Sequence, residues 1–287
     1  MSAAAGRFAI IGWPVAQSRS PLIHNHWLAA QGEKPLYEAY PIDPQNDFRA
    51  ALENMAAAGF VGANVTAPHK AAAFAAMDKL TEAAETLGAV NTISFSGGQM
   101  HGANTDGDGF VASLDEAAQN SGGASWRTRP ALVLGAGGAA RAIVAALGRA
   151  GIGDMRLVNR TRAKAEALSG LAAHVRIEDW RARAELADGC GLLVNTTSLG
   201  MVGKPPLDLP EAAFAGLSDK ALVCDIVYAP LETPLLRAAR AAGHVGVDGL
   251  GMLLHQAALS FEIWRGTRPH IDAALRDKLI ADLAQEA

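Results

Sequence analysis

Polar side chains gather at the end of a predicted strand in the first third of this 287-residue chain. In the segment Asn64-Val-Thr-Ala-Pro-His-Lys70, period-2 alternation places Asn64 and Thr66 on one face and the intervening valine on the other. Pro68 ends the strand, and a helix that begins there carries Lys70 in its first turn. Because open α/β sheets bind ligands at strand ends, this amine could exchange a proton with a bound small molecule. The alternative is a solvated lysine near a helix start.

Two further segments supply groups that could act on the same ligand. Asn104-Thr-Asp-Gly-Asp-Gly109 carries Asp106 on a glycine-flanked loop just before a predicted helix at 110–118. Ser18-Arg-Ser-Pro21 carries two hydroxyls, Ser18 and Ser20, which face the same way in an extended segment and can bind a carboxylate or a hydroxyl. The alternatives are a turn or helix-capping carboxylate for Asp106 and a helix N-cap for the serines.

The stretch Leu132-Val-Leu-Gly-Ala-Gly-Gly-Ala-Ala140 is an apolar strand that runs into a glycine-rich turn and an alanine-rich helix. Gly135 and Gly137 can adopt backbone angles that other residues avoid. The helix that follows directs unpaired amides and a partial positive charge at a phosphate. This pattern is typical of a site for a dinucleotide pyrophosphate.

The next predicted strand, Met155-Arg-Leu-Val-Asn-Arg160, ends roughly 20 residues beyond the turn, where the residue that recognises the ribose is expected. No acid stands there. Arg160 suits a 2′-phosphate, and Lys164 one turn later adds a second cation. The sequence therefore predicts NADP rather than NAD, the alternative being that both are ordinary solvated charges.

Alternating strands and helices must position these groups. Upstream we expect strands at 8–12, 36–42 and 62–66 and helices at 21–31 and 45–58. Downstream we expect strands at 131–135, 154–159, 191–196, 221–227 and 244–247, and helices at 138–150, 162–171, 233–242, 250–264 and 271–285. This alternation predicts an α/β protein of two domains, the second a doubly wound parallel sheet. The junction falls between 107 and 130, where Gln119-Asn-Ser-Gly-Gly-Ala-Ser125 has the most linker-like composition.

Composition excludes several classes of protein. Half of the residues are hydrophobic, and the net charge is −4 with scattered basic residues, which argues against a nucleic-acid partner. The chain has neither a membrane-length apolar run nor the apolar segment of a signal peptide near its start. The two cysteines, Cys190 and Cys224, favour a reducing, cytoplasmic setting. The histidines lack metal-ligand spacing, so no metal is expected, and the five tryptophans are interpreted as packing residues.

Together with Val90-Asn-Thr92 and Gly249-Leu-Gly-Met-Leu-Leu-His-Gln-Ala257, these segments resemble the shikimate dehydrogenase family over nearly the whole chain. The ordered motifs are Ser-x-Ser-Pro, Asn-Val-Thr-x-Pro-x-Lys, Gly-Ala-Val-Asn-Thr, Asn-Thr-Asp-Gly, Gly-Ala-Gly-Gly-Ala, Asn-Arg-Thr, Asn-Thr-Thr-Ser-x-Gly-Met and Asp-Gly-x-x-Met-Leu-x-x-Gln. The resemblance implies NADPH-dependent, reversible reduction of 3-dehydroshikimate to shikimate, in the pathway to chorismate and the aromatic amino acids. It also implies a substrate-binding and catalytic α/β domain at 1–107, rejoined by C-terminal helices at 252–287, and an NADP-binding Rossmann domain at 108–251.

The resemblance also assigns roles to single residues. Ketone reduction needs a hydride at carbon and a proton at the developing alkoxide, so the implied catalytic pair is Lys70, as proton donor, and Asp106, which orients it. The implied substrate-binding residues are Ser18, Ser20, Thr66, Asn91, Asp106, Tyr228 and Gln256. The implied cofactor-binding residues are Gly135, Ala136, Gly137, Gly138, Ala139, Asn159, Arg160, Thr161, Lys164, Ile226, Gly249, Met252 and Glu82.

Three other functions stay open. A quinate/shikimate dehydrogenase accepts an extra ring hydroxyl and often prefers NAD, against which Arg160 argues. A non-catalytic protein that senses NADPH would have lost the reaction, against which Lys70 and Asp106 argue. A dehydrogenase of similar plan acting on a folate or an aminoacyl-tRNA ester would lack the first-domain motifs. A small-molecule substrate is the expected partner, and a homodimer is left open.

Overall fold

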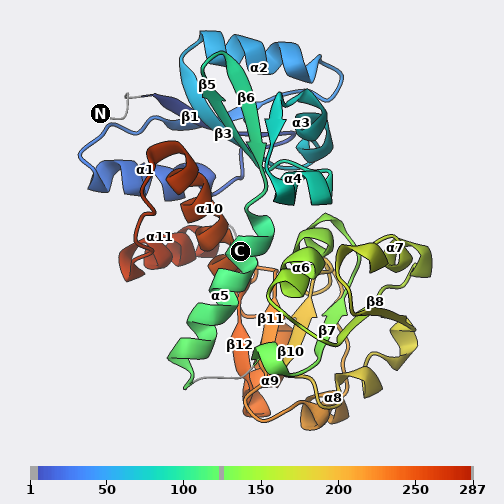
Figure 1. Ribbon diagram of the computed structural model, residues 1–287. Coiled ribbons are helices and arrows are strands. Elements are labelled where there is room, and N and C mark those ends of the chain that lie inside the picture. The colour runs from blue at the N-terminus through green and yellow to red at the C-terminus, as the bar shows by residue number, and fades with distance from the viewer. Residues whose placement is uncertain (1–5, 123–125, 286–287) are drawn as a thin grey trace. The chain divides into compact units, whose positions relative to one another are not determined.

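The computed structural model describes residues 6–122 and 126–285, so the end of the expected linker, 123–125, lies outside the described residues. The chain divides into two compact units, which we describe separately (Figure 1). The first unit comprises the chain up to Thr105 together with Gln256–Leu279, and the second comprises Asp106–His255 and the residues from Ile280. The division falls within one helix, α10 (Gly249–Arg265).

A six-stranded mixed sheet with the order β2-β1-β3-β5-β6-β4 forms the centre of the first unit. Its strands are β1 (Arg7–Gly12), β2 (Tyr37–Pro41), β3 (Phe60–Val65), β4 (Lys79–Leu80), β5 (Thr92–Ser96) and β6 (Gln99–Ala103). β1 pairs in parallel with β2 and β3, whereas β5 is antiparallel to both β3 and β6. The sequence analysis missed the β5–β6 hairpin, whose turn residues Gly97 and Gly98 both have positive φ, as a two-residue type I′ turn requires.

Helices cover both faces of this sheet. Along β1, Ala9 and Ile11 pack in the cluster that contains Leu52 of α2 (Phe48–Ala57) and Ala73 of α3 (Lys70–Ala76). Phe8 points the other way, and its ring centroid lies 5.1 Å from that of Trp264 in α10. On the same face, α1 (Ser20–Ala30) contributes His24 and Trp27 to an aromatic cluster. Two further helices, α4 (Glu82–Leu87) and α11 (Ala273–Ala284), belong wholly or mainly to this unit.

The second unit is built on a six-stranded parallel sheet with the order β12-β11-β10-β7-β8-β9. Its strands are β7 (Ala131–Leu134), β8 (Met155–Val158), β9 (Val175–Glu178), β10 (Leu192–Asn195), β11 (Leu222–Asp225) and β12 (Val245–Val247). Counted within the unit, this is the order 3-2-1-4-5-6 read from the β9 edge, which defines the Rossmann fold. The predicted doubly wound parallel sheet is confirmed.

Both faces of this parallel sheet are buried, as alternation along β7 shows. Ala131 and Val133 pack toward α5 (Asp106–Asn120) and α6 (Gly138–Arg149), whereas Leu132 and Leu134 pack toward α8 (Glu211–Gly216) and α9 (Pro234–Ala241). A strand buried on both sides must be apolar throughout. Cys224 of β11 is 1% exposed and packs as a small buried hydrophobe.

The helix expected at 162–171 is shorter than predicted. It forms α7 (Arg162–Glu166), and a separate 3₁₀ turn follows at Ser169–Leu171. The Ser169 hydroxyl donates to the Glu166 carbonyl at 2.8 Å and so competes with the helical backbone, and Gly170 weakens the helix further. The chain then enters β9, which the sequence analysis did not predict.

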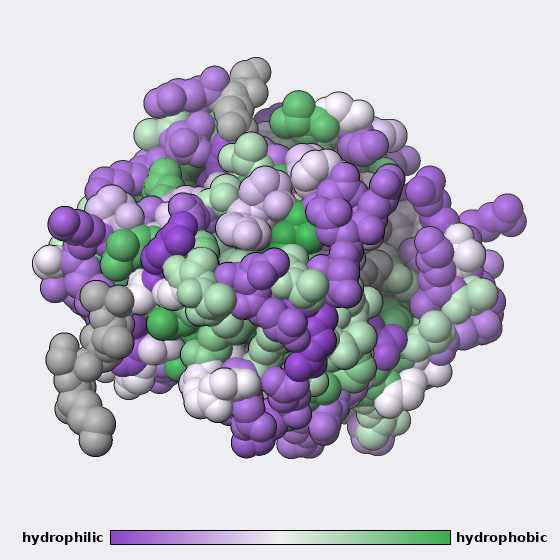
Figure 2. Space-filling view, turned by 90° about the horizontal axis from the view of Figure 1, so that it is seen from above, coloured by the Kyte–Doolittle hydropathy of each residue, from purple (hydrophilic) through white to green (hydrophobic). Residues whose placement is uncertain are grey.

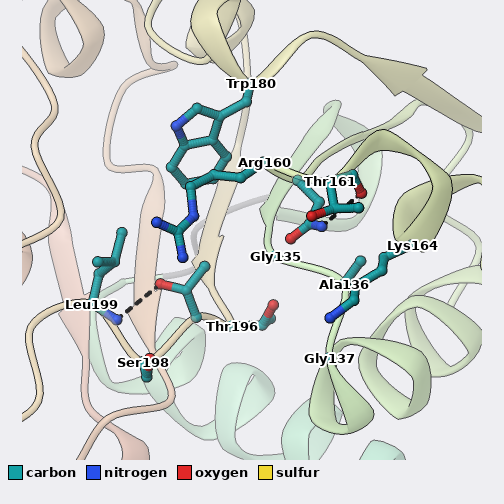
Figure 3. Close-up of a pocket in the computed structure, with 12 residues that line it drawn as sticks. Gly135, Ala136, Gly137, Arg160, Thr161, Lys164, Trp180, Thr196, Ser198 and Leu199 are labelled. Carbon is teal, nitrogen blue, oxygen red and sulfur yellow. Dashed lines mark hydrogen bonds between the residues drawn. The ribbon is translucent and has the colours of Figure 1, made fainter.

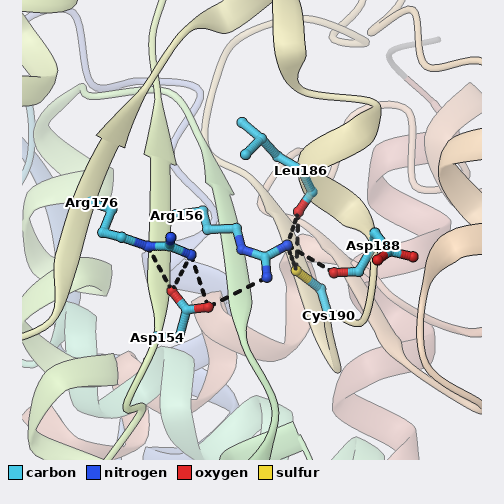
Figure 4. A network of polar contacts seen from close by, with 6 residues as sticks. All are labelled: Asp154, Arg156, Arg176, Leu186, Asp188 and Cys190. Atoms are coloured by element: carbon cyan, nitrogen blue, oxygen red, sulfur yellow. Dashed lines mark hydrogen bonds and ion pairs between the residues drawn. The ribbon is translucent and has the colours of Figure 1, made fainter.

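A network of hydrogen bonds centred on an arginine surrounds the start of β8 in the second unit (Figure 4). Arg156 donates to the carbonyl oxygens of Leu186 at 2.6 Å and Asp188 at 2.8 Å, and so joins β8 to the segment before β10. Asp154 accepts from both Arg156 and Arg176, at 3.4 Å and 2.8 Å. The network fixes the start of β8, and Arg160 follows two residues after the end of that strand.

The face shown in Figure 2 intersperses hydrophilic with hydrophobic residues. Trp13 has 46% of its surface exposed, so its interpretation as a packing residue is wrong, whereas Trp27 and Trp126 are buried. Across residues 6–122 and 126–285, no helix has the length and apolar character needed to cross a membrane.

Candidate functional site

The glycine-rich turn connects β7 to α6 in the second unit. Gly135 has φ +110°, and a Cβ added to it would lie 2.5 Å from Thr196 Oγ1. Gly135 therefore lets the chain turn against the end of β10, where the Thr196 hydroxyl donates to the Leu134 carbonyl at 2.8 Å. Beyond it, Gly137 and Gly138 face open space, so a ligand can approach the backbone at the N-terminus of α6.

A cavity of about 270 Å³ lies beside this turn, within the second unit (Figure 3). Its lining brings together the turn, the segment after β8 and the segment after β10: Gly135, Ala136, Gly137, Asn159, Arg160, Thr161, Lys164, Trp180, Thr196, Thr197, Ser198 and Leu199. Arg160 and Lys164 thus share one cavity with the turn. Two cations, exposed amides and hydroxyls suit a phosphorylated nucleotide, and this donor set fits NADP.

Five residues of this lining were not predicted as site residues. Trp180 was interpreted as packing. It does pack against the cluster of Leu193 and Phe214, but it also lines the cavity. The other four, Thr196, Thr197, Ser198 and Leu199, follow β10 directly. The available signal was a polar run at the end of an apolar strand, because ligands bind where the strand order of such a sheet reverses.

The segment after β11 brings together three other predicted cofactor residues. A Cβ on Gly249 would overlap the Ile226 carbonyl oxygen, so only glycine lets α10 begin against this segment. Ile226 and Met252 pack against the same hydrophobic cluster. Asp225, just before them, is fully buried, which raises its pKa, and it accepts from Asn195, Val227 and Thr233 in partial compensation.

In the first unit, Lys70 is the first residue of α3, which confirms its predicted place in the first helical turn. Its carbonyl oxygen accepts from Val90 at 3.0 Å, so the residue lies beside the segment that leads into Asn91. The adjacent His69 turns into the core instead: its Nε2 lies 2.7 Å from the Ile42 carbonyl oxygen, and its ring stacks on Phe48. His69 therefore has a packing role in the core of the first unit.

Asn91 and Gln256 come together although 165 residues separate them. Asn91 Nδ2 donates to Gln256 Oε1 at 3.4 Å and to Thr105 Oγ1 at 2.9 Å. Asn91 Oδ1 accepts from the Thr105 amide at 2.9 Å and from Thr92 Oγ1 at 2.9 Å. Two predicted substrate residues thus form one buried polar cluster at the ends of β3, β5 and β6.

The serine pair lies at the start of α1, where Ser18 Oγ accepts from the Ser20 amide at 3.3 Å. The cap position belongs to Arg19, so Ser20 is the first residue of the helix. Thr66 follows β3, and its backbone amide donates to the Ile11 carbonyl oxygen at 2.8 Å. The serine pair therefore lies at the start of α1, and Thr66 lies just after the end of β3.

Other predicted residues belong to the second unit. Asp106 is the first residue of α5, so its expected place on a loop before a helix at 110–118 is wrong: the helix begins four residues earlier. Tyr228 follows β11. Glu82 opens α4 in the first unit and is not part of the cavity lining, so its cofactor role stays a prediction. Within the described ranges, no group of three or more His, Cys, Asp or Glu side chains could hold a metal ion.

A Rossmann sheet with a cationic nucleotide cavity, joined to a unit with a buried polar cluster, defines a class: the two-unit dehydrogenases that use a nicotinamide dinucleotide. Family models match three parts of the chain. They are the shikimate dehydrogenase substrate binding domain at 10–93, shikimate/quinate 5-dehydrogenase at 116–188 and the shikimate 5′-dehydrogenase C-terminal domain at 249–276.

Full-length relatives agree with these matches. A protein of Methylocella silvestris named shikimate dehydrogenase (NADP(+)) is 51% identical over 99% of each chain, and one of Mesorhizobium japonicum with the same name is 50% identical over 96% of this chain and 95% of its own. The chain belongs to the shikimate dehydrogenase family.

Solved structures include two informative neighbours. Shikimate 5-dehydrogenase from Thermus thermophilus, in complex with NADP(H) and shikimate, has a TM-score of 0.81 at 36% identity and covers 96% of this chain and 99% of its own. Quinate dehydrogenase from Corynebacterium glutamicum, in complex with NAD, has a TM-score of 0.86 at 29% identity, with coverage of 96% and 98%.

Proposed function

We propose that this protein catalyses the NADPH-dependent, reversible reduction of 3-dehydroshikimate to shikimate, in the pathway to chorismate and the aromatic amino acids. The observation that carries the proposal is identity of about half the residues, over nearly the full chain, to relatives named NADP-dependent shikimate dehydrogenases. The chain's own residues agree with it, because the nucleotide cavity carries two cations and the first unit carries the polar cluster.

The cofactor would be held by the second unit. Gly135, Gly137 and the N-terminus of α6 would bind the pyrophosphate, with Ala136, Gly138 and Ala139 in the same segment. Arg160 and Lys164 would bind the 2′-phosphate, flanked by Asn159 and Thr161. Ile226, Gly249 and Met252 would contact the nicotinamide end. We assign a cofactor contact to Glu82 on the resemblance alone.

The first unit would bind the substrate and move its proton. NADPH, when bound, supplies the hydride to the ring carbon. Lys70 donates a proton to the developing alkoxide and accepts it back when the alcohol is oxidised, while Asp106 orients the ammonium group. A cation beside the oxygen also stabilises the negative charge that develops there.

The remaining polar residues would orient the ring. The amides of Asn91 and Gln256 can both donate to and accept from ring hydroxyls. Ser18 and Ser20 would bind the carboxylate, and Thr66 and Tyr228 would complete the substrate contacts. On this assignment, residues 1–107 with 252–287 form the substrate-binding and catalytic domain, and 108–251 the NADP-binding domain. We also propose a cytoplasmic location and, as the simplest assembly, a homodimer.

Product analysis tests the proposal. Purified protein incubated with 3-dehydroshikimate and NADPH should consume both in equal amounts and release shikimate, identified by NMR. With NADPH that carries deuterium at the transferred position, the deuterium should appear at the former ketone carbon. A protein that binds NADPH without consuming 3-dehydroshikimate would support the non-catalytic alternative and contradict this function.

A further inference from the structure

Ser260 lies at the centre of the buried polar cluster of the first unit. It is fully buried in α10, one helical turn beyond Gln256. Its Oγ lies 2.9 Å from Asn64 Nδ2, 2.7 Å from Thr92 Oγ1 and 3.0 Å from the Gln256 carbonyl oxygen. A serine inside a helix usually needs only its own helix's carbonyl, so contacts with β3 and β5 indicate a connecting role.

Two hydroxyls link this cluster to Asn91. Thr92 Oγ1 donates to Asn91 Oδ1 at 2.9 Å, and Ser260 Oγ lies 2.7 Å from Thr92 Oγ1, a contact in which either hydroxyl can donate. Ser260 in turn accepts from Asn64 Nδ2, whose own amide is fixed because Asn64 Oδ1 accepts from the Tyr37 hydroxyl at 2.8 Å.

The chain of bonds ends on the two amides assigned to the substrate. Asn91 Oδ1 accepts from the Thr105 backbone N–H and from Thr92 Oγ1, so Asn91 Nδ2 faces Thr105 Oγ1 and Gln256 Oε1. The Thr105 hydroxyl then donates to the Gln256 carbonyl at 3.0 Å. An amide can be turned end for end at little steric cost, so only its partners decide which end meets a ligand.

We infer that Ser260 is a positioning residue that holds the Asn91 and Gln256 side chains in the places from which they contact the substrate. This inference rests on the proposed function and deepens it. Without the Ser260 hydroxyl, Asn64, Thr92 and the Gln256 carbonyl each lose a hydrogen-bond partner. The Asn91 amide keeps its end-to-end orientation through the Thr105 backbone N–H, but the link that fixes α10, and with it Gln256, against β3 and β5 is lost.

Ser260→Ala tests the role, and Ser113→Ala is the matched control. Ser113 is also a buried serine inside a helix, but its hydroxyl donates to the carbonyl oxygen of Phe110 in the same helix at 2.7 Å. We expect Ser260→Ala to lower kcat/KM for shikimate about tenfold, mainly through KM, with the Kd for NADP unchanged within about twofold. Ser113→Ala should leave both values near those of the wild type.

Thr92→Val removes the next hydroxyl in the same series of hydrogen bonds and keeps the shape of the side chain. This variant replaces Ser260→Ala as the test if Ser260→Ala does not fold. The double variant should lose little more than either single one, because both break one chain. Ser260→Ala protein that melts earlier but keeps the wild-type KM and kcat would overturn the positioning role. Failure of the proposed function would be recognised separately, as a wild-type protein that does not turn over shikimate at all.

A separate observation concerns the cavity of the second unit. Trp180 enters it beside Arg160 (Figure 3). The Arg183 guanidinium carbon lies 5.2 Å from the indole centroid, and Arg183 itself donates to the Asp208 carbonyl oxygen at 2.9 Å. Arg183, which is not part of the cavity lining, thus holds the indole in place. The indole forms an aromatic wall of a cavity that is otherwise lined largely by small and polar groups.

The geometry points to a contact between Trp180 and the adenine base of NADP. Adenine and the 2′-phosphate are attached to the same ribose, so a base whose phosphate is bound by Arg160 reaches the neighbouring wall of the same cavity. A purine gains binding energy from an aromatic side chain through its π face.

Adenosine 2′,5′-bisphosphate, which carries the base and the 2′-phosphate but no nicotinamide, tests this contact without turnover. Trp180→Leu should raise its Kd about tenfold by calorimetry. Its addition should quench tryptophan fluorescence in the wild type and not in the variant. Trp13→Leu, at an exposed tryptophan of the first unit, is the control and should retain both signals. An unchanged Kd in Trp180→Leu would refute the contact.

Discussion

At the level of single residues, the proposed chemistry depends most on Lys70. Replacing it with alanine removes the group that donates the proton, so kcat should fall by about 10²–10⁴. The nucleotide cavity has no lining residue from α3, so the Kd for NADP should stay within about twofold of the wild-type value. Steady-state kinetics and NADP titration measure the two effects. Lys34→Ala, at an exposed lysine, controls for loss of charge, and an unchanged kcat in Lys70→Ala would eliminate the assignment.

Arg160 determines the predicted preference for the phosphorylated cofactor. Arg160→Ala would remove the proposed charge-assisted bond to the 2′-phosphate, so the Kd for NADP should rise about tenfold or more while the Kd for NAD changes little. Arg181→Ala, an exposed arginine outside the cavity lining, should change neither value. Equal weakening of both cofactors would show that Arg160 does not recognise the phosphate.

His24 makes the stability of the first unit depend on pH. Burial among aromatic rings lowers its pKa from 6.5 to about 3, an effect that the Asn64 amide only partly offsets. Between these values the unfolded chain binds more protons than the folded one, so stability falls as pH drops through that window. From pH 7 to pH 5 this costs about 2 kcal/mol.

The measurement is urea unfolding at both pH values. His24→Phe should remove this loss of about 2 kcal/mol, whereas His174→Phe, at an exposed histidine, should keep it. A pH dependence that is identical in wild-type and His24→Phe proteins would show that the buried imidazole is not responsible.

At the level of elements, the β7–α6 turn depends on one backbone angle. Gly135→Ala places a Cβ at φ +110°, 2.5 Å from Thr196 Oγ1, so the turn must shift. We expect a loss of about 1–3 kcal/mol in stability and markedly weaker NADP binding. Thermal melting and calorimetry measure both. Gly153→Ala adds the same methyl group in open space and is the control. A Gly135→Ala protein that binds NADP normally would contradict the role of the turn.

Elements whose signal is local could be predicted from the sequence. The β7 strand, the glycine turn and Arg160 lie within 30 consecutive positions, from Ala131 to Arg160, and the pattern predicted their shared site. The β5–β6 hairpin was missed because its strands are short and mix polar with apolar residues. The helix expected at 162–171 is too long, because Ser169 and Gly170 disfavour its continuation and α7 ends at Glu166.

At the scale of the whole molecule, long-range contacts explain what could not be predicted. Ser260 bonds to Asn64, 196 positions away, and nothing in its own neighbourhood of the sequence indicates that partner. Trp180 is interpreted from the sequence as a packing residue and does pack, and only the tertiary fold brings it to the cavity as well. Residues defined by the tertiary fold alone escape any argument from local pattern.

The proposed function requires that the enzyme prefer shikimate as substrate and NADP as cofactor at the same time. The most direct measurement follows formation of the reduced cofactor by the wild-type protein with shikimate or quinate, each with NADP or NAD. We predict fast turnover for shikimate with NADP and slow turnover for the other three combinations. Comparable rates with quinate or with NAD would contradict the claim and favour a quinate/shikimate dehydrogenase instead.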